Sequence, residues 1–235
     1  MQTTKTSNDQ VAFTDERITQ PVSRRKFLGY VGATSAIIAT GASCKKNNND
    51  NNGVDLGSGD VGILNYAYAL EQLEAAFYIQ VVATPYSGIS AAELSFMTDI
   101  RDHEIAHREF FKAAITAAAP NSIIPGLEVD FSSINFGTRA SVLGTAMAFE
   151  DLGVTAYDGA GYLIKNPNYL LVAGKIVSVE ARHAALIREL ITVNSFLGDQ
   201  VDTNSVNISR TPLEVLAIAG TYIKTKINAS NLPTG

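Results

Sequence analysis

Four short acidic segments recur in a fixed order along this chain and restrict what it can fold into. Glu104-Ile-Ala-His107 and Glu180-Ala-Arg-His183 each place a histidine three residues after a glutamate. Glu71 and Glu150 alternate with them, so the order is Glu, Glu-x-x-His, Glu, Glu-x-x-His. A four-helix bundle that holds two metal ions takes one glutamate from each of two helices and one Glu-x-x-His pair from each of the other two. The pattern therefore predicts an all-α fold with a metal site between four helices.

The bulk composition is compatible with one helical domain and excludes some partners. The chain has 235 residues, of which 46% are hydrophobic, and this suits one core with a tail. Its net charge of -5 argues against nucleic acid, which requires a basic face. Cys44 is the single cysteine, so we expect no internal disulfide.

Residues 1–43 have the pattern of an export signal. Ser23-Arg24-Arg25-Lys26-Phe27-Leu28 leads into a weakly apolar run that ends near Ala42. Paired arginines before such a run are typical of a twin-arginine export signal. The alternatives are an ordinary export signal or a retained anchor helix, although the run is shorter than the roughly 20 residues that span a bilayer. A twin-arginine signal exports folded proteins, so a metal could be inserted in the cytoplasm.

The end of this signal is similar to a bacterial lipoprotein cleavage site. Thr40-Gly41-Ala42-Ser43-Cys44 has small residues before the cysteine, although Gly41 stands where a bulky aliphatic residue is usual. We expect Cys44 to be lipidated; otherwise it is lost with the signal. Residues 44–58 are rich in asparagine and predict a flexible tether. The chain is then expected in the periplasm or cell envelope, with a lipid anchor as its membrane contact.

Residues 59–229 alternate long helical patterns with short breaks. The periodicity predicts helices over about 61–82, 91–119, 139–164 and 169–193, and a last helix that begins at Thr211-Pro212-Leu213-Glu214. Ser90 with Glu93, and Thr211 with Glu214, have the spacing of capping boxes. Short turns make two antiparallel hairpins, and residues 120–138 are long enough to cross from one end of the bundle to the other.

Helical spacing places the candidate ligands on the apolar faces of their helices. Ile100 and Phe111 share the face of Glu104, whereas Arg101 and Lys112 point away. Burying four carboxylates is prohibitive without compensation, and two divalent ions supply the four positive charges needed. Oxygen-rich ligation with one nitrogen per metal suits iron or manganese, and the absence of thiolates disfavours structural zinc. The candidate ligands are Glu71, Glu104, His107, Glu150, Glu180 and His183.

Two neighbouring side chains are further candidates. Glu74 also leans toward the interior, but an internal repeat aligns Glu71 with Glu150 and Glu74 with Gly153. Glu71 is thus the repeated position, and Glu74 stays an alternative ligand or a partner of the ligands. His103 lies one turn before the Glu-x-x-His histidine, at the edge of the apolar face. We expect it beside the ligands or partly exposed.

The same repeat contains two tyrosines, each seven residues after a candidate glutamate. Tyr78 and Tyr157 lie two turns along the helix face that carries the ligand. As candidate catalytic residues they could donate a hydrogen bond to a ligand carboxylate or carry an electron. The alternative is that both are core aromatics.

Three segments carry a resemblance to a known family. They are the run from Leu64 through Glu71 and Glu74 to Tyr78, the segment Phe149-Glu150-Asp151-Leu152-Gly153-Val154, and the segment Val179-Glu180-Ala-Arg-His183 with the residues up to Arg188. Residues 61–190 resemble the exported branch of the ferritin-like superfamily, which includes desiccation-related plant proteins and fungal stress proteins. The resemblance implies a ferritin-like four-helix bundle plus a C-terminal helix, with the six candidate ligands around two metal ions. It specifies fold better than activity, because the superfamily includes iron stores, peroxidases, oxygenases and members with no known reaction.

Two functions of different classes follow. The first is an exported dimetal carboxylate oxidoreductase that uses iron or manganese to act on dioxygen, peroxide or iron. The second is a non-catalytic envelope or stress protein whose metal is structural or whose site is vestigial. Metal removal separates them, because a structural site unfolds when stripped. An oligomer is compatible with either.

Overall fold

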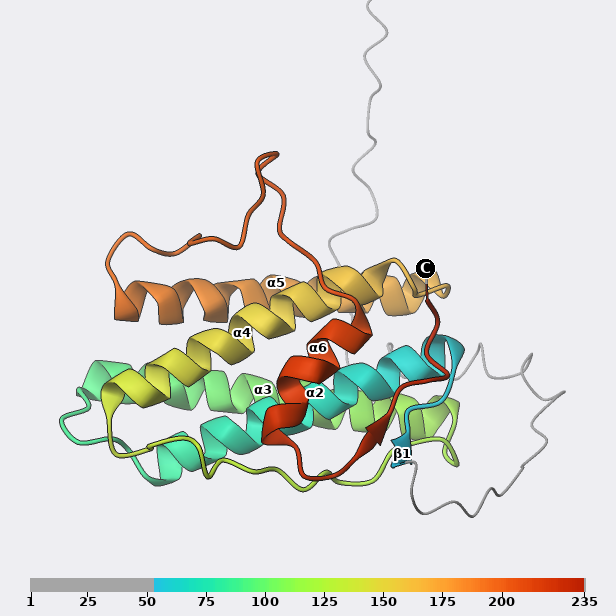
Figure 1. Cartoon of the computed structure of the whole chain (residues 1–235), viewed down its shortest axis with the longest axis horizontal. Coiled ribbons are helices and arrows are strands. Elements are labelled where there is room, and N and C mark those ends of the chain that lie inside the picture. The colour runs from blue at the N-terminus through green and yellow to red at the C-terminus, as the bar shows by residue number, and fades with distance from the viewer. Residues whose placement is uncertain (1–52, 235) are drawn as a thin grey trace, which may run out of the picture.

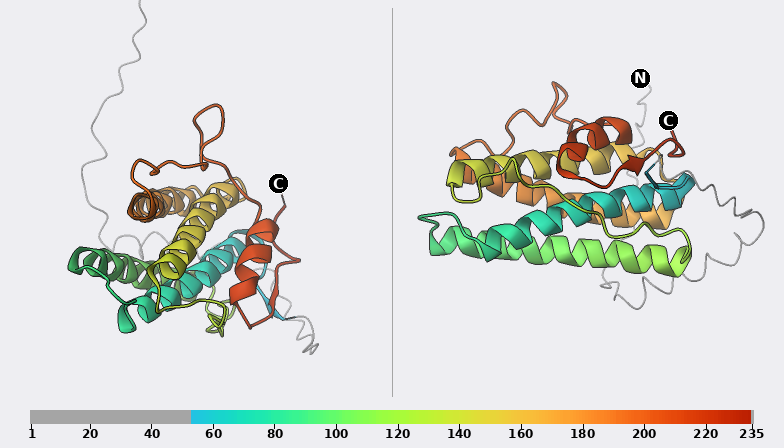
Figure 2. Two further views of the ribbon diagram at one scale, coloured as in Figure 1. Left: turned by 60° about the vertical axis from the view of Figure 1, so that its left-hand side comes forward. Right: turned by 60° about the horizontal axis from the view of Figure 1, so that its bottom comes forward.

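Four long helices form the body of the molecule in the computed structural model, which describes residues 53–234 (Figure 1). They are α2 (Gly59–Ala83), α3 (Ala91–Ala118), α4 (Arg139–Gly161) and α5 (Pro167–Ile191). The α2–α3 hairpin lies against the α4–α5 hairpin in a second layer (Figure 2). This confirms the all-α bundle of two hairpins. The predicted export signal and Cys44 lie outside the described residues.

The helix ends follow local capping chemistry. Ser90 Oγ accepts a hydrogen bond from Glu93 N–H at 3.1 Å, but the Glu93 carboxylate accepts bonds from Arg139 and Tyr86, so the expected capping box is only half formed there. Thr211 with Glu214 forms the complete box at the start of α6 (Pro212–Ala219). Both arrangements satisfy N–H groups that the first turn of a helix leaves unpaired.

The α4–α5 turn differs from the sequence-based boundaries. We expected a helix to about residue 164 and the next from about 169, whereas α4 ends at Gly161 and α5 begins at Pro167. The Asp60 carboxylate accepts hydrogen bonds from the backbone N–H groups of Lys165 and Asn166, both at 2.8 Å. These two N–H groups therefore do not take part in helical hydrogen bonds. Proline then suits the first turn of α5 because its missing N–H is not needed there.

Buried amide side chains on α2 hold the crossover against the bundle. Residues 120–138 run along the bundle from one end to the other (Figure 1). Asn65 is fully buried; its Oδ1 accepts from Ile124 N–H at 3.2 Å and its Nδ2 donates to the Ser122 carbonyl at 2.7 Å. Gln72 Oε1 accepts from Leu127 N–H at 2.8 Å. These bonds satisfy backbone groups of an irregular segment that packs on the core.

The start of the described chain corrects one expectation. Residues 54–58 were predicted to belong to the tether, but β1 (Val54–Asp55) pairs in parallel with β2 (Ile227–Asn228), and Leu56 is completely buried. Burial of the apolar Leu56 side chain stabilises the packing of this segment on the bundle, which the polar composition of the tether did not indicate. The C-terminal segment, with α6 and the 3₁₀ turn η2 (Gly220–Tyr222), crosses the outer face of α4 (Figure 1).

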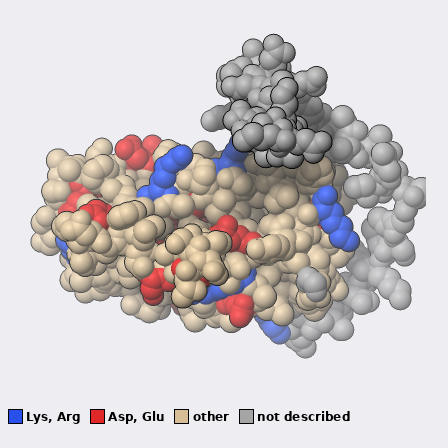
Figure 3. Space-filling model, turned by 90° about the horizontal axis from the view of Figure 1, so that it is seen from above, with Lys and Arg blue, Asp and Glu red and all other residues tan. Residues whose placement is uncertain are grey.

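An aromatic group fills the core between the crossover and the helices. Phe77 is fully buried, and its ring centroid lies 5.1 Å from that of Phe149, 6.0 Å from Phe131 and 5.8 Å from Phe136. Among residues 53–234, no helix combines the length and apolarity needed to cross a membrane. On the face shown in Figure 3, acidic and basic side chains are interspersed among uncharged ones.

Candidate metal centre

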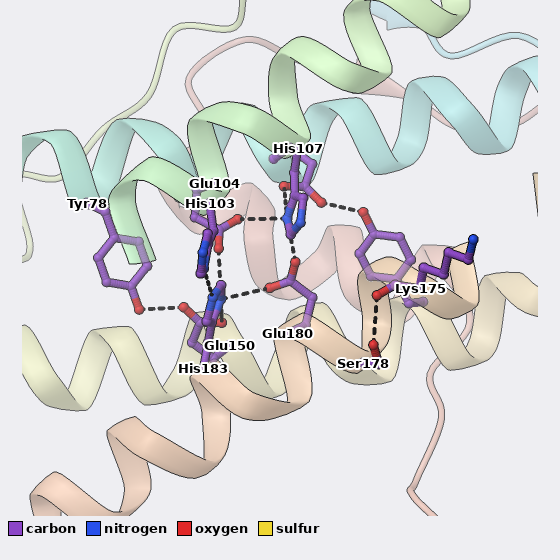
Figure 4. Close-up of polar contacts among 11 residues, drawn as sticks. Tyr78, His103, Glu104, His107, Glu150, Lys175, Ser178, Glu180 and His183 are labelled. Atoms are coloured by element: carbon purple, nitrogen blue, oxygen red, sulfur yellow. Dashed lines mark hydrogen bonds and ion pairs between the residues drawn. The ribbon is translucent and has the colours of Figure 1, made fainter. Parts of the chain in front are cut away.

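A cluster of buried carboxylates and imidazoles lies at the centre of the bundle, with contributions from all four long helices (Figure 4). Two overlapping groups each bring four ligand atoms within 4.8 Å of one another. One group contains Glu71, Glu104, His107 and Glu180, and the other contains Glu104, Glu150, Glu180 and His183. The structure therefore brings together all six residues that the sequence pattern singled out.

Glu104 and Glu180 belong to both groups. His107 Nδ1 lies 2.7 Å from Glu180 Oε1, and His183 Nδ1 lies 3.0 Å from Glu104 Oε1. Each Glu-x-x-His pair thus directs its histidine toward the glutamate of the other pair. Glu71 and Glu150 each belong to one group only. The site has an approximate twofold arrangement that follows the internal repeat.

The cluster has the properties of a cation site. All four glutamates are completely shielded from solvent. Both oxygens of Glu104 and Glu180, one oxygen each of Glu71 and Glu150, and Nδ1 of both histidines are buried without a hydrogen bond of proper geometry. Unpaired buried groups of this kind cost several kcal/mol unless a cation or proton compensates them. Carboxylate oxygens with one imidazole nitrogen per group fit iron or manganese.

Two tyrosines donate hydrogen bonds between helices to Glu71 and Glu150, the glutamates that belong to one ligand group each. Tyr78 of α2 donates a hydrogen bond to Glu150 Oε1 of α4 at 2.5 Å, and Tyr157 of α4 donates to Glu71 Oε1 of α2. The sequence placed each tyrosine on the face of its own helix's glutamate. The structure instead pairs each with the glutamate of the other half. Burial first, and then the charge of the nearby glutamates, raises the pKa of both phenols, so they remain donors.

Without a metal, protons compensate the carboxylates. Burial raises the pKa of Glu104 to about 8, with a further contribution from the charge of Glu180. Burial would lower the pKa of His183, but the close contacts of its Nδ1 with the carboxylates of Glu104, Glu150 and Glu180 outweigh burial and raise the value to about 12. For Glu180, burial raises the pKa but the two histidines outweigh it and lower the value to about 2. The imidazoles thus supply the positive charge that metal ions would supply in the loaded protein.

Glu74 lies beside the cluster in space that a glycine provides. It is 4% exposed and belongs to neither ligand group. A Cβ atom on Gly153 would lie 3.0 Å from Glu74 Oε1. The internal repeat pairs these two positions, so the half that lacks the extra carboxylate supplies the room for it. Burial, followed by the charges of four glutamates, raises the pKa of Glu74 well above its ordinary value.

His103 contacts the outer edge of one candidate ligand. It is exposed, and its ring stacks on that of His183 with a centroid separation of 5.1 Å. His103 Nδ1 lies 2.9 Å from His183 Nε2. Figure 4 shows the two residues next to each other. With a metal on Nδ1, His183 carries its proton on Nε2 and donates it to His103. Such a partner fixes the tautomer and ring orientation of a metal-binding histidine. Among residues 53–234, His107 Nε2 has no comparable partner.

An ion pair behind the site joins the two helices of the second hairpin, and the sequence alone did not reveal it. Arg188 of α5 donates to both carboxylate oxygens of Asp151 on α4, at 2.9 and 2.5 Å, and to Asp199 at 3.0 Å. Asp151 directly follows Glu150, so this pair fixes α4 close to a candidate ligand. Gly198 packs so closely on Arg188 that a Cβ would lie 1.8 Å from its Nη1. The segment after α5 thus contacts this ion pair through Gly198 and Asp199. Sequence reasoning gave no role to this segment.

The fold and the site together define the class of protein. It is a helical bundle in which four long helices surround a buried cluster of carboxylates and histidines that can hold metal. The ferritin-like domain family matches residues 59–193, and the chain belongs to this family. A search of curated proteins found no match. The match does not separate the branches of the family, so membership of the exported, desiccation-related branch stays a prediction.

Proposed function

We propose that this protein is a dimetal carboxylate oxidoreductase that acts on dioxygen or peroxide with two iron or manganese ions. One observation carries the proposal. Two overlapping groups of buried ligand atoms share Glu104 and Glu180, and most carboxylate oxygens of the four glutamates in these groups have no hydrogen-bond partner. The ligands would be Glu71, Glu104, His107, Glu150, Glu180 and His183. When bound there, two ions that change between the divalent and trivalent states would supply two electrons, which together with two protons suffice to reduce peroxide to two waters or dioxygen to peroxide.

The protein residues would bind the metal pair and control its surroundings. Glu104 and Glu180 would contribute ligand oxygens to both metal positions, because both groups contain them. Four carboxylate charges would balance two divalent ions, and neutral imidazoles add no charge. Tyr78 and Tyr157 donate hydrogen bonds to the two unshared glutamates, which orients one oxygen of each and leaves the other for metal. Their phenols are also redox-active side chains in direct contact with candidate ligands.

Export and lipid anchoring are part of the proposal. The paired arginines at 24 and 25, and Cys44 before an asparagine-rich stretch, support passage across the membrane and attachment by lipid. The site would then act in the periplasm or cell envelope. Labelling with a radioactive fatty acid, compared with a Cys44→Ala variant, tests the anchor. Equal labelling of both proteins would contradict it.

Metal content is the first test of the function. We expect about two iron or manganese ions per chain, and their loss in a Glu104→Ala, Glu180→Ala double variant. The ferrous form should be oxidised by peroxide or dioxygen with optical changes that the double variant lacks. A folded wild-type chain without bound metal would overturn the proposal. A chain that binds metal, shows no oxidation and unfolds on chelation would instead have a structural site.

A further inference from the structure

A second feature of the bundle is a small apolar cavity between the four long helices. All four contribute small or apolar side chains, including Ala67 of α2, Ala114 of α3 and Ala160 of α4. Its lining comes from the first half of α2, the second halves of α3 and α4 and the start of α5, so the cavity lies toward the end of the bundle that carries the α4–α5 turn. It does not include any of the six candidate ligands.

Tyr157 connects this cavity with the candidate metal centre. It belongs to the cavity lining, and its hydroxyl donates a hydrogen bond to Glu71, a candidate ligand outside the lining. The inner lining is buried, as Tyr157 and Ala160 are 8% and 4% exposed. At the other end the lining includes Ile164, Tyr169 and Val172, which are only partly buried. The cavity therefore extends from partly exposed side chains near the start of α5 to a tyrosine in contact with a metal ligand.

The size of the cavity restricts its occupant. Its free volume is about 30 Å³. A water-sized molecule needs about 10–15 Å³, and a cavity that binds benzene has about 150 Å³. The space therefore fits a diatomic molecule or a single large atom. It is too small for an acyl chain or an aromatic substrate.

The chemistry of the lining restricts it further. The polar groups in the lining are tyrosine hydroxyls, and that of Tyr157 is already bonded to Glu71. The hydroxyl of Tyr66 is buried without a partner. A buried water requires two to four polar partners, and apolar cavities of this type stay dry and take up apolar gases. Hydrogen peroxide, which donates and accepts hydrogen bonds, would lose them on entry.

We propose that this cavity binds dioxygen and delivers it to the metal cluster past Tyr157. The inference rests on the proposed function and narrows it, because it makes dioxygen the oxidant that the fold admits by an apolar path. Peroxide would have to reach the metals from the side of the cluster where His107 is partly exposed and His103 is exposed. Occlusion of the cavity should then separate the two oxidants.

The test fills the cavity without touching a ligand. Ala114→Leu should occupy the free volume, with Ala160→Val as a milder variant if the first does not fold. Ala219→Leu is the matched control, because Ala219 is completely buried in α6 and outside the cavity lining. Crystals of the full-length chain under xenon pressure should show one xenon atom in the cavity of the wild type and the control. Both cavity variants should lack it.

Oxidation rates of the iron-loaded chain give the second readout. Oxidation by dioxygen should slow several-fold in the cavity variants and remain unchanged in the control, while oxidation by peroxide stays equal in all. A wild type without xenon, a folded filled variant with an unchanged dioxygen rate, or equal slowing with both oxidants would overturn the inference. If xenon binds but neither oxidant reacts with the wild type, the proposed function fails and the dioxygen route fails with it. Normal peroxide turnover with no dioxygen effect would overturn the route alone.

Discussion

The hydroxyl of Tyr78 donates a 2.5 Å hydrogen bond to Glu150, which lies 72 residues later and on a different helix. Tyr157 makes the reciprocal contact with Glu71. Each half of the internal repeat therefore supplies a tyrosine that donates a hydrogen bond to a candidate ligand of the other half, Glu150 or Glu71. This exchange joins α2 to α4 by two hydrogen bonds within the cluster of candidate ligands. It also fixes the orientation of one oxygen of each of these two buried carboxylates.

Loss of either tyrosine hydroxyl should weaken the metal-loaded protein. Tyr78→Phe and Tyr157→Phe each remove a donor to a buried carboxylate, and we expect each to lower the free energy of unfolding by about 1.5–3 kcal/mol. Denaturant unfolding of the loaded chain measures the change. Tyr222→Phe serves as a control, because Tyr222 packs on Phe149 at 4.9 Å but contacts no ligand. No loss of stability in either tyrosine variant would mean that they act only as core aromatics.

The shared and unshared glutamates should differ in metal stoichiometry. Glu71→Ala or Glu150→Ala removes a ligand from one group, so about one ion per chain should remain. Glu104→Ala or Glu180→Ala removes a ligand from both groups and should reduce binding of both ions. Elemental analysis of folded, purified variants provides the count. Equal loss in all four variants would contradict two distinct positions.

His103 should support one metal position only. His103→Ala removes the partner of His183 Nε2 at 2.9 Å. Partners of this kind typically contribute about 10–100-fold to metal affinity. We expect weaker binding at the position that contains His183 and unchanged binding at the position that contains His107. Competition with a chelator measures both, and Asp102→Ala is the control because Asp102 is an exposed neighbour that faces away. Equal weakening of both positions would argue against this role.

Gly153 and Glu74 should be energetically coupled. In the wild-type background, Gly153→Ala places a Cβ 3.0 Å from a buried Glu74 oxygen and should destabilise the fold. With Glu74→Ala present, the same change should stabilise the fold by about 0.5–1 kcal/mol, because alanine is a better helix former than glycine. A double-mutant cycle in denaturant gives the coupling energy. Additive effects would show that Gly153 does not make room for Glu74.

The metal-free chain should lose stability as pH rises from about 5 to about 9. Folding raises the pKa of Glu104 to about 8 and that of His183 to about 12. A group whose pKa is raised on folding stabilises the fold fully below its unfolded pKa, and this contribution is lost as pH rises through the folded value. Glu180, with a pKa lowered to about 2, has the opposite sign, but its contribution is lost only at acid pH below this range.

The metal-loaded chain should show the opposite trend over the same range, because metal binding requires deprotonated ligands. Urea unfolding at several pH values, with and without chelator, tests both forms. Metal-free stability that is constant or increases toward alkaline pH would contradict the assignment of protons to the cluster.

The sequence alone determined the fold class and the six residues that meet at the centre. Glu-x-x-His spacing places both side chains on one helix face, and apolar periodicity turns that face inward. The repeat also singled out Glu71 over Glu74 as the member of the ligand group. These features are local: they depend on helical geometry that any sufficiently periodic segment adopts.

Only the tertiary structure decided which side chains meet across helices. The pairing of Tyr78 with Glu150, of His103 with His183, and of Arg188 with Asp151 depends on the rotation and offset of packed helices, which the period of one helix does not contain. The same holds for the burial of Leu56, whose backbone N–H donates to the carbonyl of Asn228, 172 positions later, and for the cavity beside Tyr157. A cavity is the space that four packed surfaces fail to fill, so it exists only once all four are in place.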